Sequence, residues 1–253
     1  MTRVAPSLGP PDLSAAGAWL AARSATDRKQ RGTWPTPWWV CEAVVDRIAP
    51  DLGPAPVVVD PACGDGRWLI AVARRRPQAR LVGLDADPLA IEAARITLGR
   101  AGVVAELGCA DALAADAVPR CDWVVGNPPF VRPQHLARDV AADVWARFSV
   151  ATDKVDLSAC FAERAVDRAP RAALVLPANL LSLASFAALR RRLAAAGVDG
   201  VFALPDDAFG ATIRSVVVVV GPADRRVAGA LGPDGFSADG ALAESGGVWS
   251  LDG

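Results

Sequence analysis

The segment Asn127-Pro128-Pro129-Phe130 carries residue types that could do chemistry, and it directly follows the apolar run 122–126. Each proline lacks a backbone N–H and fixes φ, so nearby carbonyl oxygens stay free to accept hydrogen bonds from a bound amino group. The Asn127 side chain adds an acceptor, and the Phe130 ring adds a stacking face. The segment predicts a site for a planar group that carries an amine. A plain turn at the end of a strand is the alternative interpretation.

A second candidate site lies upstream, where the apolar run Val57–Asp60 leads into the loop Pro61–Gly66 and then into a helical stretch. A strand, a tight turn with glycines and a helix start form the nucleotide-binding crevice of open α/β sheets. Asp85 ends the next apolar run, at about the 20-residue offset expected of an acid that binds ribose hydroxyls. The loop lacks the Gly-x-Gly-x-x-Gly pattern, so we expect a nucleoside ligand without a pyrophosphate.

Strands and helices that alternate along the chain must position these segments. Apolar runs predict strands at 56–60, 80–85, 103–107, 121–126, 171–177, 199–204 and 213–220, and helices at 12–23, 37–48, 66–76, 88–100, 137–147, 155–168 and 182–196. This alternation predicts an α/β fold with a mostly parallel, seven-stranded sheet and helices on both faces. The valine run 216–220 is typical of a strand that is buried on both sides.

Nine segments in chain order have a pattern in common with one family: Arg31–Pro37, Asp60–Gly66, Leu84–Pro88, Cys109–Ala112, Asn127–Arg132, Lys154–Leu157, Ala173–Asn179, Asp207–Phe209 and Ser215–Val220. In these segments the chain resembles the S-adenosylmethionine-dependent methyltransferases. More narrowly, it resembles the adenine-specific amino-group DNA methyltransferases of type I and fused restriction-modification systems. The resemblance implies a Rossmann-like methyltransferase fold, a catalytic domain over residues 31–220 and S-adenosyl-L-methionine as cofactor.

The resemblance also implies roles for individual residues. The implied cofactor-binding residues are Thr36, Pro37, Asp60, Pro61, Ala62, Cys63, Gly64, Gly66, Asp85, Ala86, Asp111, Ala112 and Asn127. Within this set, Asp85 would accept hydrogen bonds from the ribose hydroxyls and Asp111 from the adenine amine. The implied catalytic residues are Asn127, Pro128, Pro129 and Phe130. The alternative for Asp111 is an ordinary loop residue, and for Gly64 and Gly66 it is a turn without ligand contact.

Methyl transfer to an aromatic amine is difficult because the nitrogen lone pair is delocalised into the ring. If the Asn127 side-chain oxygen and the Pro128 carbonyl accept the two amine N–H groups, the nitrogen becomes pyramidal and its developing charge is stabilised. This chemistry needs no strong general base, and the single histidine, His135, is expected at the surface or a helix start. Phe130 and Phe209 are expected to stack on the two faces of the target ring. Arg132 is expected to contact a substrate phosphate. Core packing is the alternative for Phe209, and solvated surface is the alternative for Arg132.

Composition limits the class of protein. The 253 residues carry a net charge of −1, and the five cysteines lack paired spacing, so we expect neither a disulfide framework nor a metal site. No apolar stretch approaches the ~20 residues of a membrane span, and the N-terminus has no signal pattern. The sequence therefore predicts a cytoplasmic enzyme without a membrane segment.

The segments outside 31–220 weaken the DNA interpretation. Residues 1–30 predict a helical extension, and residues 221–253 predict a short Gly/Asp-rich tail that is too short and too acidic to recognise a DNA sequence. An autonomous duplex binder usually presents a basic surface, whereas this chain is almost neutral. DNA is the partner that the resemblance implies, so either a separate subunit supplies recognition or the substrate is not duplex DNA.

Three functions remain open at this point. The first is methylation of the exocyclic amino group of adenine in DNA by direct displacement. The second is the same chemistry on another acceptor: adenine in RNA, a protein glutamine amide or a small metabolite. The third is a non-catalytic, cofactor-binding subunit, against which the intact Asn127 argues. The oligomeric state has no signal in the sequence.

Overall fold

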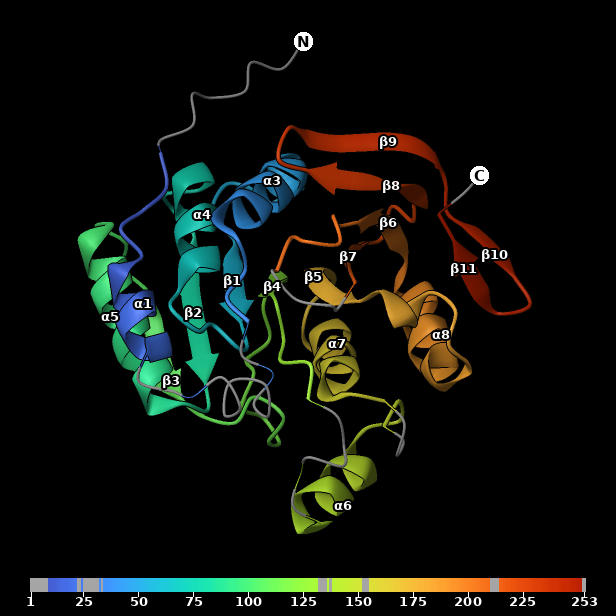
Figure 1. Cartoon of the computed structure of the whole chain (residues 1–253), viewed down its shortest axis with the longest axis horizontal. Coiled ribbons are helices and arrows are strands. Elements are labelled where there is room, and N and C mark those ends of the chain that lie inside the picture. The colour runs from blue at the N-terminus through green and yellow to red at the C-terminus, as the bar shows by residue number, and fades with distance from the viewer. Residues whose placement is uncertain are drawn as a thin grey trace.

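A computed structural model describes residues 9–21, 24, 32, 34–131, 136, 138–151, 155–209 and 214–251. Their central feature is a nine-stranded sheet with the strand order β3-β2-β1-β4-β5-β7-β6-β8-β9 (Figure 1). The strands up to residue 220 are β1 (Val57–Asp60), β2 (Arg80–Asp85), β3 (Glu106–Cys109), β4 (Trp123–Gly126), β5 (Arg171–Pro177), β6 (Val198–Ala203) and β7 (Ser215–Val220). Strands β1 to β5 pair in parallel, and β7 runs antiparallel to both β5 and β6.

The strand order places a crevice between β1 and β4. From β1 the chain moves outward to β2 and β3, and it then returns to β4 on the other side of β1. The loops that follow β1 and β4 therefore leave the sheet in opposite directions. Such a reversal point, at the carboxyl ends of parallel strands, is where open α/β sheets bind their ligands.

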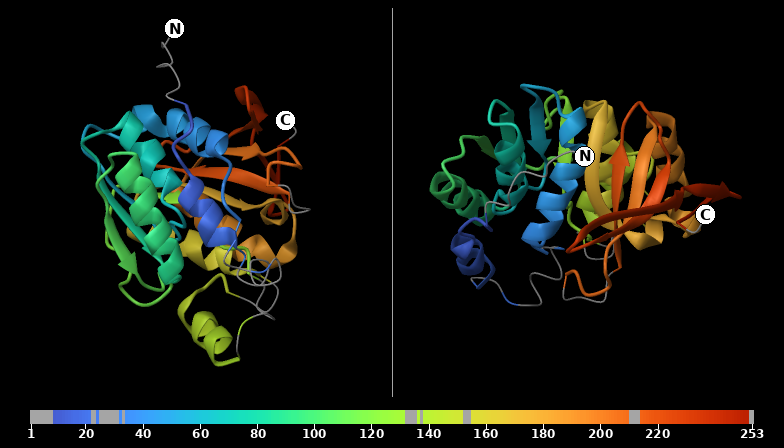
Figure 2. Two further views of the ribbon diagram at one scale, coloured as in Figure 1. Left: turned by 60° about the vertical axis from the view of Figure 1, so that its left-hand side comes forward. Right: turned by 90° about the horizontal axis from the view of Figure 1, so that it is seen from above.

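Helices cover both faces of the sheet (Figure 2). They are α1 (Ser14–Ala21), α3 (Trp38–Ile48), α4 (Arg67–Arg75), α5 (Pro88–Arg100), α6 (Arg138–Arg147), α7 (Leu157–Arg168) and α8 (Ala187–Ala196), with short 3-10 turns at Ala49–Asp51, Ala178–Leu180 and Ala184–Phe186. Successive residues of one strand face opposite layers. Val58 packs in the apolar core formed with α3, α4 and α5, whereas Val59 packs in the core formed with α7 and α8.

Strand β7 confirms the predicted burial of the valine run. Val216, Val218 and Val220 belong to the core beside α7 and α8, and Val217 and Val219 belong to the core beside α3 and α4. All five side chains are buried. The predicted α/β fold with a mostly parallel sheet and helices on both faces is likewise confirmed.

The predicted number of seven strands is wrong, because the segment expected to be a Gly/Asp-rich tail extends the sheet. β8 (Val227–Gly232) pairs in parallel with β6, and β9 (Gly235–Ala241) pairs antiparallel with β8. A separate hairpin follows, formed by β10 (Ala243–Ser245) and β11 (Val248–Ser250). β8 and β9 contain no long apolar run, so this segment of the sequence carried no strand signal. Backbone pairing to the open edge of β6 and a few buried side chains hold them in the sheet.

Three predicted boundaries shift for local reasons. Strand β3 begins at Glu106 and not at 103, because the Val103 N–H still bonds to the Leu98 carbonyl (2.9 Å) and closes the end of α5. Helix α1 begins at Ser14 and not at 12, since the Asp12 carboxylate accepts the Ser14 N–H (2.9 Å). The helix expected at 182–196 begins at Ala187, after the two 3-10 turns. No helix in the described part of the chain is both long and apolar enough to cross a membrane.

Candidate active site

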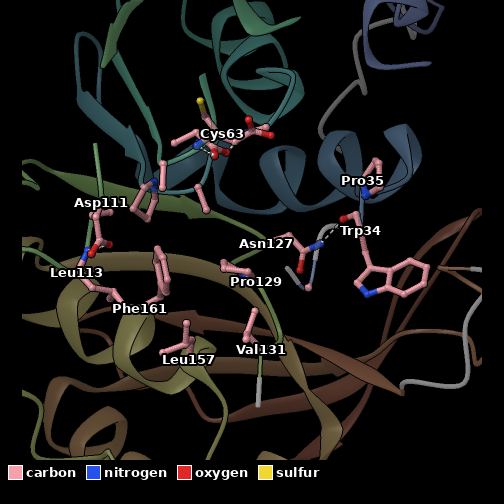
Figure 3. A pocket seen from close by; sticks show the side chains of 18 of the residues that line it. Trp34, Pro35, Cys63, Asp111, Leu113, Asn127, Pro129, Val131, Leu157 and Phe161 are labelled. Atoms are coloured by element: carbon pink, nitrogen blue, oxygen red, sulfur yellow. Dashed lines mark hydrogen bonds between the residues drawn. The ribbon is translucent and has the colours of Figure 1, made fainter. Parts of the chain in front are cut away.

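A cavity of about 510 Å³ lies at the carboxyl ends of β1, β2, β3 and β4 (Figure 3). The loops after these strands form one side of it, and Leu157 and Phe161 of α7 and Val144 of α6 form another. This volume is typical of a cavity that encloses a small molecule or cofactor. The cavity occupies the reversal point of the sheet, where the sequence predicted a nucleotide-binding crevice.

Two backbone N–H groups of the loop after β1 hold it against the end of β2, at the cavity. The Cys63 N–H donates to the Leu84 carbonyl (2.8 Å), and the Gly64 N–H donates to the Asp85 carboxylate (2.9 Å). Gly64 and Gly66 have φ values of 53° and 82°, a region that residues with a side chain rarely adopt. The positive φ at Gly66, the residue before α4, turns the chain into that helix. Both glycines are thus required by the turn itself.

Asp85 fixes two loops at once. One carboxylate oxygen accepts the Gly64 N–H, and the other accepts the Asp87 N–H (2.9 Å). Asp87 in turn caps α5, because its side chain accepts the Leu89 N–H (3.1 Å) and Pro88 follows at the first helical position. The half-buried Asp85 therefore lies in the cavity wall with its position set by backbone contacts.

The loop after β3 brings Asp111 to the cavity wall, next to the end of β2. Its carboxylate accepts the Leu113 N–H (2.9 Å), and the Leu113 carbonyl accepts hydrogen bonds from the guanidinium groups of Arg147 and Arg164. The preceding Ala110 N–H donates to the Asp85 carbonyl (3.0 Å). The two aspartates are thus connected through backbone and belong to one rigid edge of the cavity.

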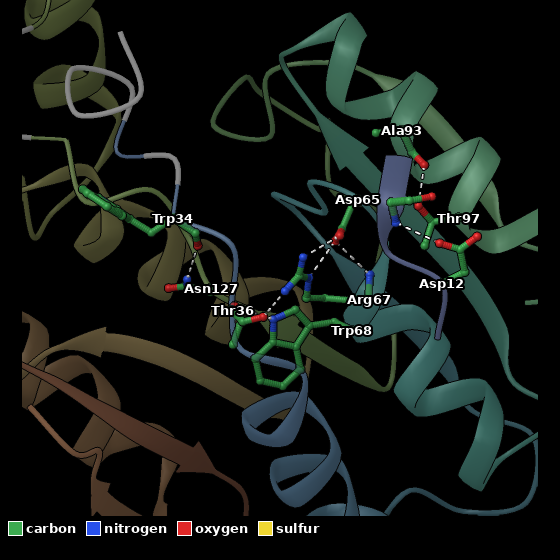
Figure 4. Close-up of polar contacts among 10 residues, drawn as sticks. Asp12, Trp34, Thr36, Asp65, Arg67, Trp68, Ala93, Thr97 and Asn127 are labelled. Atoms are coloured by element: carbon green, nitrogen blue, oxygen red, sulfur yellow. Dashed lines mark hydrogen bonds and ion pairs between the residues drawn. The ribbon is translucent and has the colours of Figure 1, made fainter. Parts of the chain in front are cut away.

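A buried ion pair between Asp65 and Arg67 lies at the start of α4, and its Arg67 side chain reaches the segment before α3 (Figure 4). Asp65 accepts two hydrogen bonds from Arg67 (2.8 and 2.6 Å), and Arg67 also donates to the Thr36 carbonyl. The Trp68 indole N–H donates to the Thr36 hydroxyl (3.2 Å). Burial alone lowers the pKa of Arg67, but the hydrogen bonds and charge of Asp65 outweigh it, and the pKa lies above its usual value. Arg67 therefore stays charged and holds Thr36 against the cavity.

Asn127 has one side-chain atom fixed and the other free. Its amide nitrogen donates to the Trp34 carbonyl (3.0 Å), which sets the orientation of the amide (Figures 3 and 4). Its side-chain oxygen is buried and has no hydrogen-bond partner among the residues that the structure describes. A buried acceptor without a partner costs free energy, about 1–3 kcal/mol. The cost falls on an atom that a bound N–H donor would satisfy.

The tetrapeptide at residues 127–130 has two faces. In an extended chain, alternate residues point to opposite sides. Asn127 and Pro129 line the main cavity, whereas Pro128 and Phe130 line a second, much smaller hollow of about 10 Å³ together with Phe209. Asn127 lines both spaces, so it stands in the wall between them.

Most of the residues predicted for the site come together. Those that line the main cavity are Thr36, Pro61, Ala62, Cys63, Gly64, Asp85, Ala86, Asp111, Ala112, Asn127 and Pro129, and those that line the hollow are Asn127, Pro128, Phe130 and Phe209. Arg132 and His135 lie outside the described residues. Three further residues predicted to bind the cofactor do not line the cavity: Pro37, Asp60 and Gly66.

Each of these three residues has a position behind the cavity wall. The Pro37 carbonyl accepts the Val40 N–H (3.0 Å) and starts α3. Asp60 is fully buried at the end of β1, where it accepts the Ala62 N–H (3.1 Å). Gly66 turns into α4 beneath the loop. Their positions in the motifs are next to residues that line the cavity, but these three residues do not line it themselves.

Several lining residues were not predicted from the sequence: Trp19, Trp34, Asp65, Arg67, Trp68, Asp87, Leu113, Val131, Val144, Leu157 and Phe161. Leu157 and Phe161 are four residues apart on α7 and could have been found from helical periodicity. Trp34 lies within the family-like segment Arg31–Pro37, whereas Trp19 had no signal, because it meets the site only through the tertiary fold.

Comparison with known proteins agrees with this geometry. Residues 43–152 match the family model of the methyltransferase small domain, and residues 116–196 match that of the Eco57I restriction-modification methylase. The first match contains the loops after β1, β2 and β3, and both contain the tetrapeptide at 127–130. Residues 43–196 are thus covered by segments that match methyltransferase family models.

Curated relatives match the chain only in part. A release factor glutamine methyltransferase from Mycolicibacterium smegmatis is 38% identical over 88 residues, which are 33% of this chain and 31% of the relative. A ribosomal RNA small subunit methyltransferase C from Stutzerimonas stutzeri is 39% identical over 81 residues, which are 32% and 24% of the two chains. The alignments thus span less than a third of either relative.

Solved structures share the methyltransferase fold. A Listeria monocytogenes protein assigned to the class I S-adenosylmethionine-dependent methyltransferases has a TM-score of 0.63 at 19% identity, over 73% of this chain and 59% of that one. The methyltransferase subunit of a type I restriction-modification system from Streptococcus thermophilus has a TM-score of 0.62 at 21% identity, over 74% and 44% of the chains. The predicted Rossmann-like methyltransferase fold is confirmed, and S-adenosyl-L-methionine is its cofactor.

The charges around the cavity fit this cofactor, which carries a sulfonium and an ammonium group. Asp60 has a buried carboxylate oxygen without a hydrogen-bond partner among the described residues. Burial raises the pKa of Asp60 well above its usual value; the Ala62 N–H opposes the rise, and the charges of Asp85 and Asp65 add to it. Burial thus favours the neutral form of Asp60, and it is the carboxylates of Asp85 and Asp111 in the wall that favour a cation in the cavity.

Proposed function

We propose that this methyltransferase transfers a methyl group to the exocyclic amino nitrogen of adenine in DNA. The observation that carries the proposal is the side chain of Asn127. Its amide nitrogen is held by Trp34, its oxygen is buried and free, and it lies between the cofactor cavity and the hollow formed by Phe130 and Phe209. An amine bound in the hollow would donate a hydrogen bond to the Asn127 side-chain oxygen. It would then lie beside the cofactor cavity, which Asn127 also lines.

The chain's own residues supply positioning and electrostatic stabilisation in this reaction. S-adenosyl-L-methionine supplies the electrophilic methyl group when it is bound. The Asn127 oxygen accepts one N–H of the amine and the Pro128 carbonyl accepts the other, which draws the lone pair out of the aromatic ring. The Trp34 carbonyl keeps the amide from rotating, so the acceptor oxygen is oriented before the substrate arrives.

On the cofactor side, the proposed contacts use the acids in the cavity wall. Asp85 accepts from the ribose hydroxyls and Asp111 from the adenine amine. Both side chains line the cavity at positions fixed by backbone hydrogen bonds. The Thr36 segment closes the side nearest Asn127, where Arg67 and Trp68 hold it in place.

The hollow beside Phe130 must widen to admit a base. Its volume of about 10 Å³ is close to that of one water, far below that of a purine ring. Aromatic rings on both sides provide stacking worth about 1–3 kcal/mol per base, which helps to offset the extrusion of a base from a duplex. We propose Phe130 and Phe209 as the two stacking faces and Arg132 as a phosphate contact.

The support for DNA as substrate comes from the Eco57I restriction-modification methylase match over residues 116–196. We propose residues 31–220 as the catalytic domain, residues 1–30 as an extension, and a separate subunit for DNA recognition, since the net charge of −1 provides little attraction to phosphates. A glutamine amide or an RNA amine is the second candidate acceptor. The 38% and 39% identical relatives, which are named for a release factor glutamine and for ribosomal RNA, favour it.

The acceptor can be identified with labelled cofactor. Purified protein is incubated with S-adenosyl-L-methionine labelled in the methyl group and with separate pools of duplex DNA, single-stranded DNA, RNA, protein and small metabolites. We expect label in DNA as N6-methyladenine. Label confined to RNA, protein or metabolites would move the proposal to the second candidate, and label in no pool together with tight cofactor binding would favour a non-catalytic subunit.

A further inference from the structure

The N-terminal helix α1 brings a tryptophan into the cofactor cavity. Trp19 lines the cavity and is only 8% exposed. Its indole N–H donates to the Asp87 carboxylate (2.8 Å), in the same loop as Asp85. A β-carbon built on Gly64 would lie 3.5 Å from the Trp19 ring, so the ring packs directly over the glycine turn.

Helix α1 is fastened to the domain at several points. α1 lies beside α5 (Figure 1), where Trp19 forms a small apolar cluster with Ala90 and Ala93. The Arg100 guanidinium at the end of α5 pairs with Asp12 (3.0 Å), just before α1. The position of the indole is therefore fixed by packing on one side and by a hydrogen bond on the other.

We propose that Trp19 is a cofactor-binding residue that covers the ribose end of the cavity. The inference rests on the proposed cofactor contact of Asp85. The indole adjoins Gly64 and Asp87, the two residues whose N–H groups the Asp85 carboxylate holds. A nucleoside at Asp85 would have the indole plane as its outer wall, which removes it from water and slows its release. Residue 19 lies outside both segments matched by the family models.

The test compares two buried tryptophans. Trp19→Ala removes the wall, and Trp249→Ala removes a tryptophan of similar burial (2% exposed) on β11 that does not line the cavity. Binding of S-adenosyl-L-homocysteine is measured by calorimetry, its dissociation rate by stopped flow, and unfolding by calorimetric scan. We expect Trp19→Ala to raise Kd at least about tenfold, mainly through faster dissociation, and Trp249→Ala to change Kd less than about twofold while it also lowers Tm.

Equal effects of the two substitutions on Kd would overturn the proposal, because Trp19 would then act only through stability. If Trp19→Ala does not fold, Trp19→Leu keeps apolar bulk on Ala90 and Ala93 and decides the question. We expect Trp19→Leu to raise Kd about fivefold, and an unchanged Kd would contradict the inference. A wild-type protein that does not bind S-adenosyl-L-homocysteine would refute the cofactor assignment itself, which is a different result from equal binding by wild type and variant.

Discussion

Replacing Asp85 with alanine should separate ligand binding from fold. The Asp85 carboxylate accepts the N–H groups of Gly64 and Asp87, each at 2.9 Å. Hydrogen bonds to a charged group contribute about 1.5–3 kcal/mol each, and the half-exposed position of Asp85 reduces this value. We therefore expect the variant to lose about 2 kcal/mol of stability, which corresponds to a fall in Tm of about 4–8 °C in a chain of this size.

The loss of cofactor affinity in Asp85→Ala should be larger than the loss of stability can explain. Asp85→Ala removes the proposed ribose acceptor and releases the loop at Gly64, so we expect Kd for S-adenosyl-L-homocysteine to rise at least tenfold, about 1.4 kcal/mol. Asp122→Ala is the matched control, because Asp122 also accepts a backbone N–H, that of Val57 (2.7 Å), but at the opposite end of β1. Calorimetric titration of both variants is the assay. An affinity of the Asp85 variant within about twofold of wild type, or an equal loss in the Asp122 variant, would refute the reasoning.

Two further predictions concern the buried acid and the hollow. Because burial raises the pKa of Asp60, the folded state holds this proton to a higher pH than the unfolded state, so this carboxyl makes stability fall as pH rises above about 3.9. Asp60→Asn should remove that contribution to stability. Scanning fluorimetry should find the ligand-free variant more stable than wild type at pH 7 but not at pH 4. A stability difference that grows toward low pH would contradict this prediction. Phe209→Ala removes one proposed stacking face and should raise the acceptor KM about tenfold with an unchanged cofactor Kd; steady-state kinetics with the acceptor found in the labelling experiment checks this, and an unchanged KM would make Phe209 a packing residue only.

The sequence predicted the parts of the site that belong to single loops. The turn at Pro61–Gly66, the acid at Asp85 and the segment Asn127–Phe130 each combine a strand end with residues of special backbone geometry, and such combinations are visible without a fold. Parallel strands then bring their carboxyl ends to one edge, so these loops had to meet. The sequence did not predict which of these residues would line the cavity. Asp60, for example, is fully buried and does not line it.

The remaining features depend on contacts between distant segments. Trp19 meets Asp87 across 68 positions of sequence without any motif at residue 19, and Trp34 meets Asn127 across 93, a contact that the segment Arg31–Pro37 does not specify by itself. β8 and β9 contain four glycines and one aspartate, residue types that favour loops, and they become strands because β6 presents an open edge. Such pairing follows from the fold as a whole and not from local propensity.

The most direct test of the account is the turnover of Asn127→Ala beside its cofactor affinity. Removal of one preorganised hydrogen-bonding group that acts in the transition state typically costs about 10²–10³ in kcat. The account predicts a loss of this size in single-turnover methylation, with Kd for S-adenosyl-L-homocysteine within about twofold of wild type. Near-normal turnover by a variant that still binds the cofactor would contradict the proposed role of Asn127.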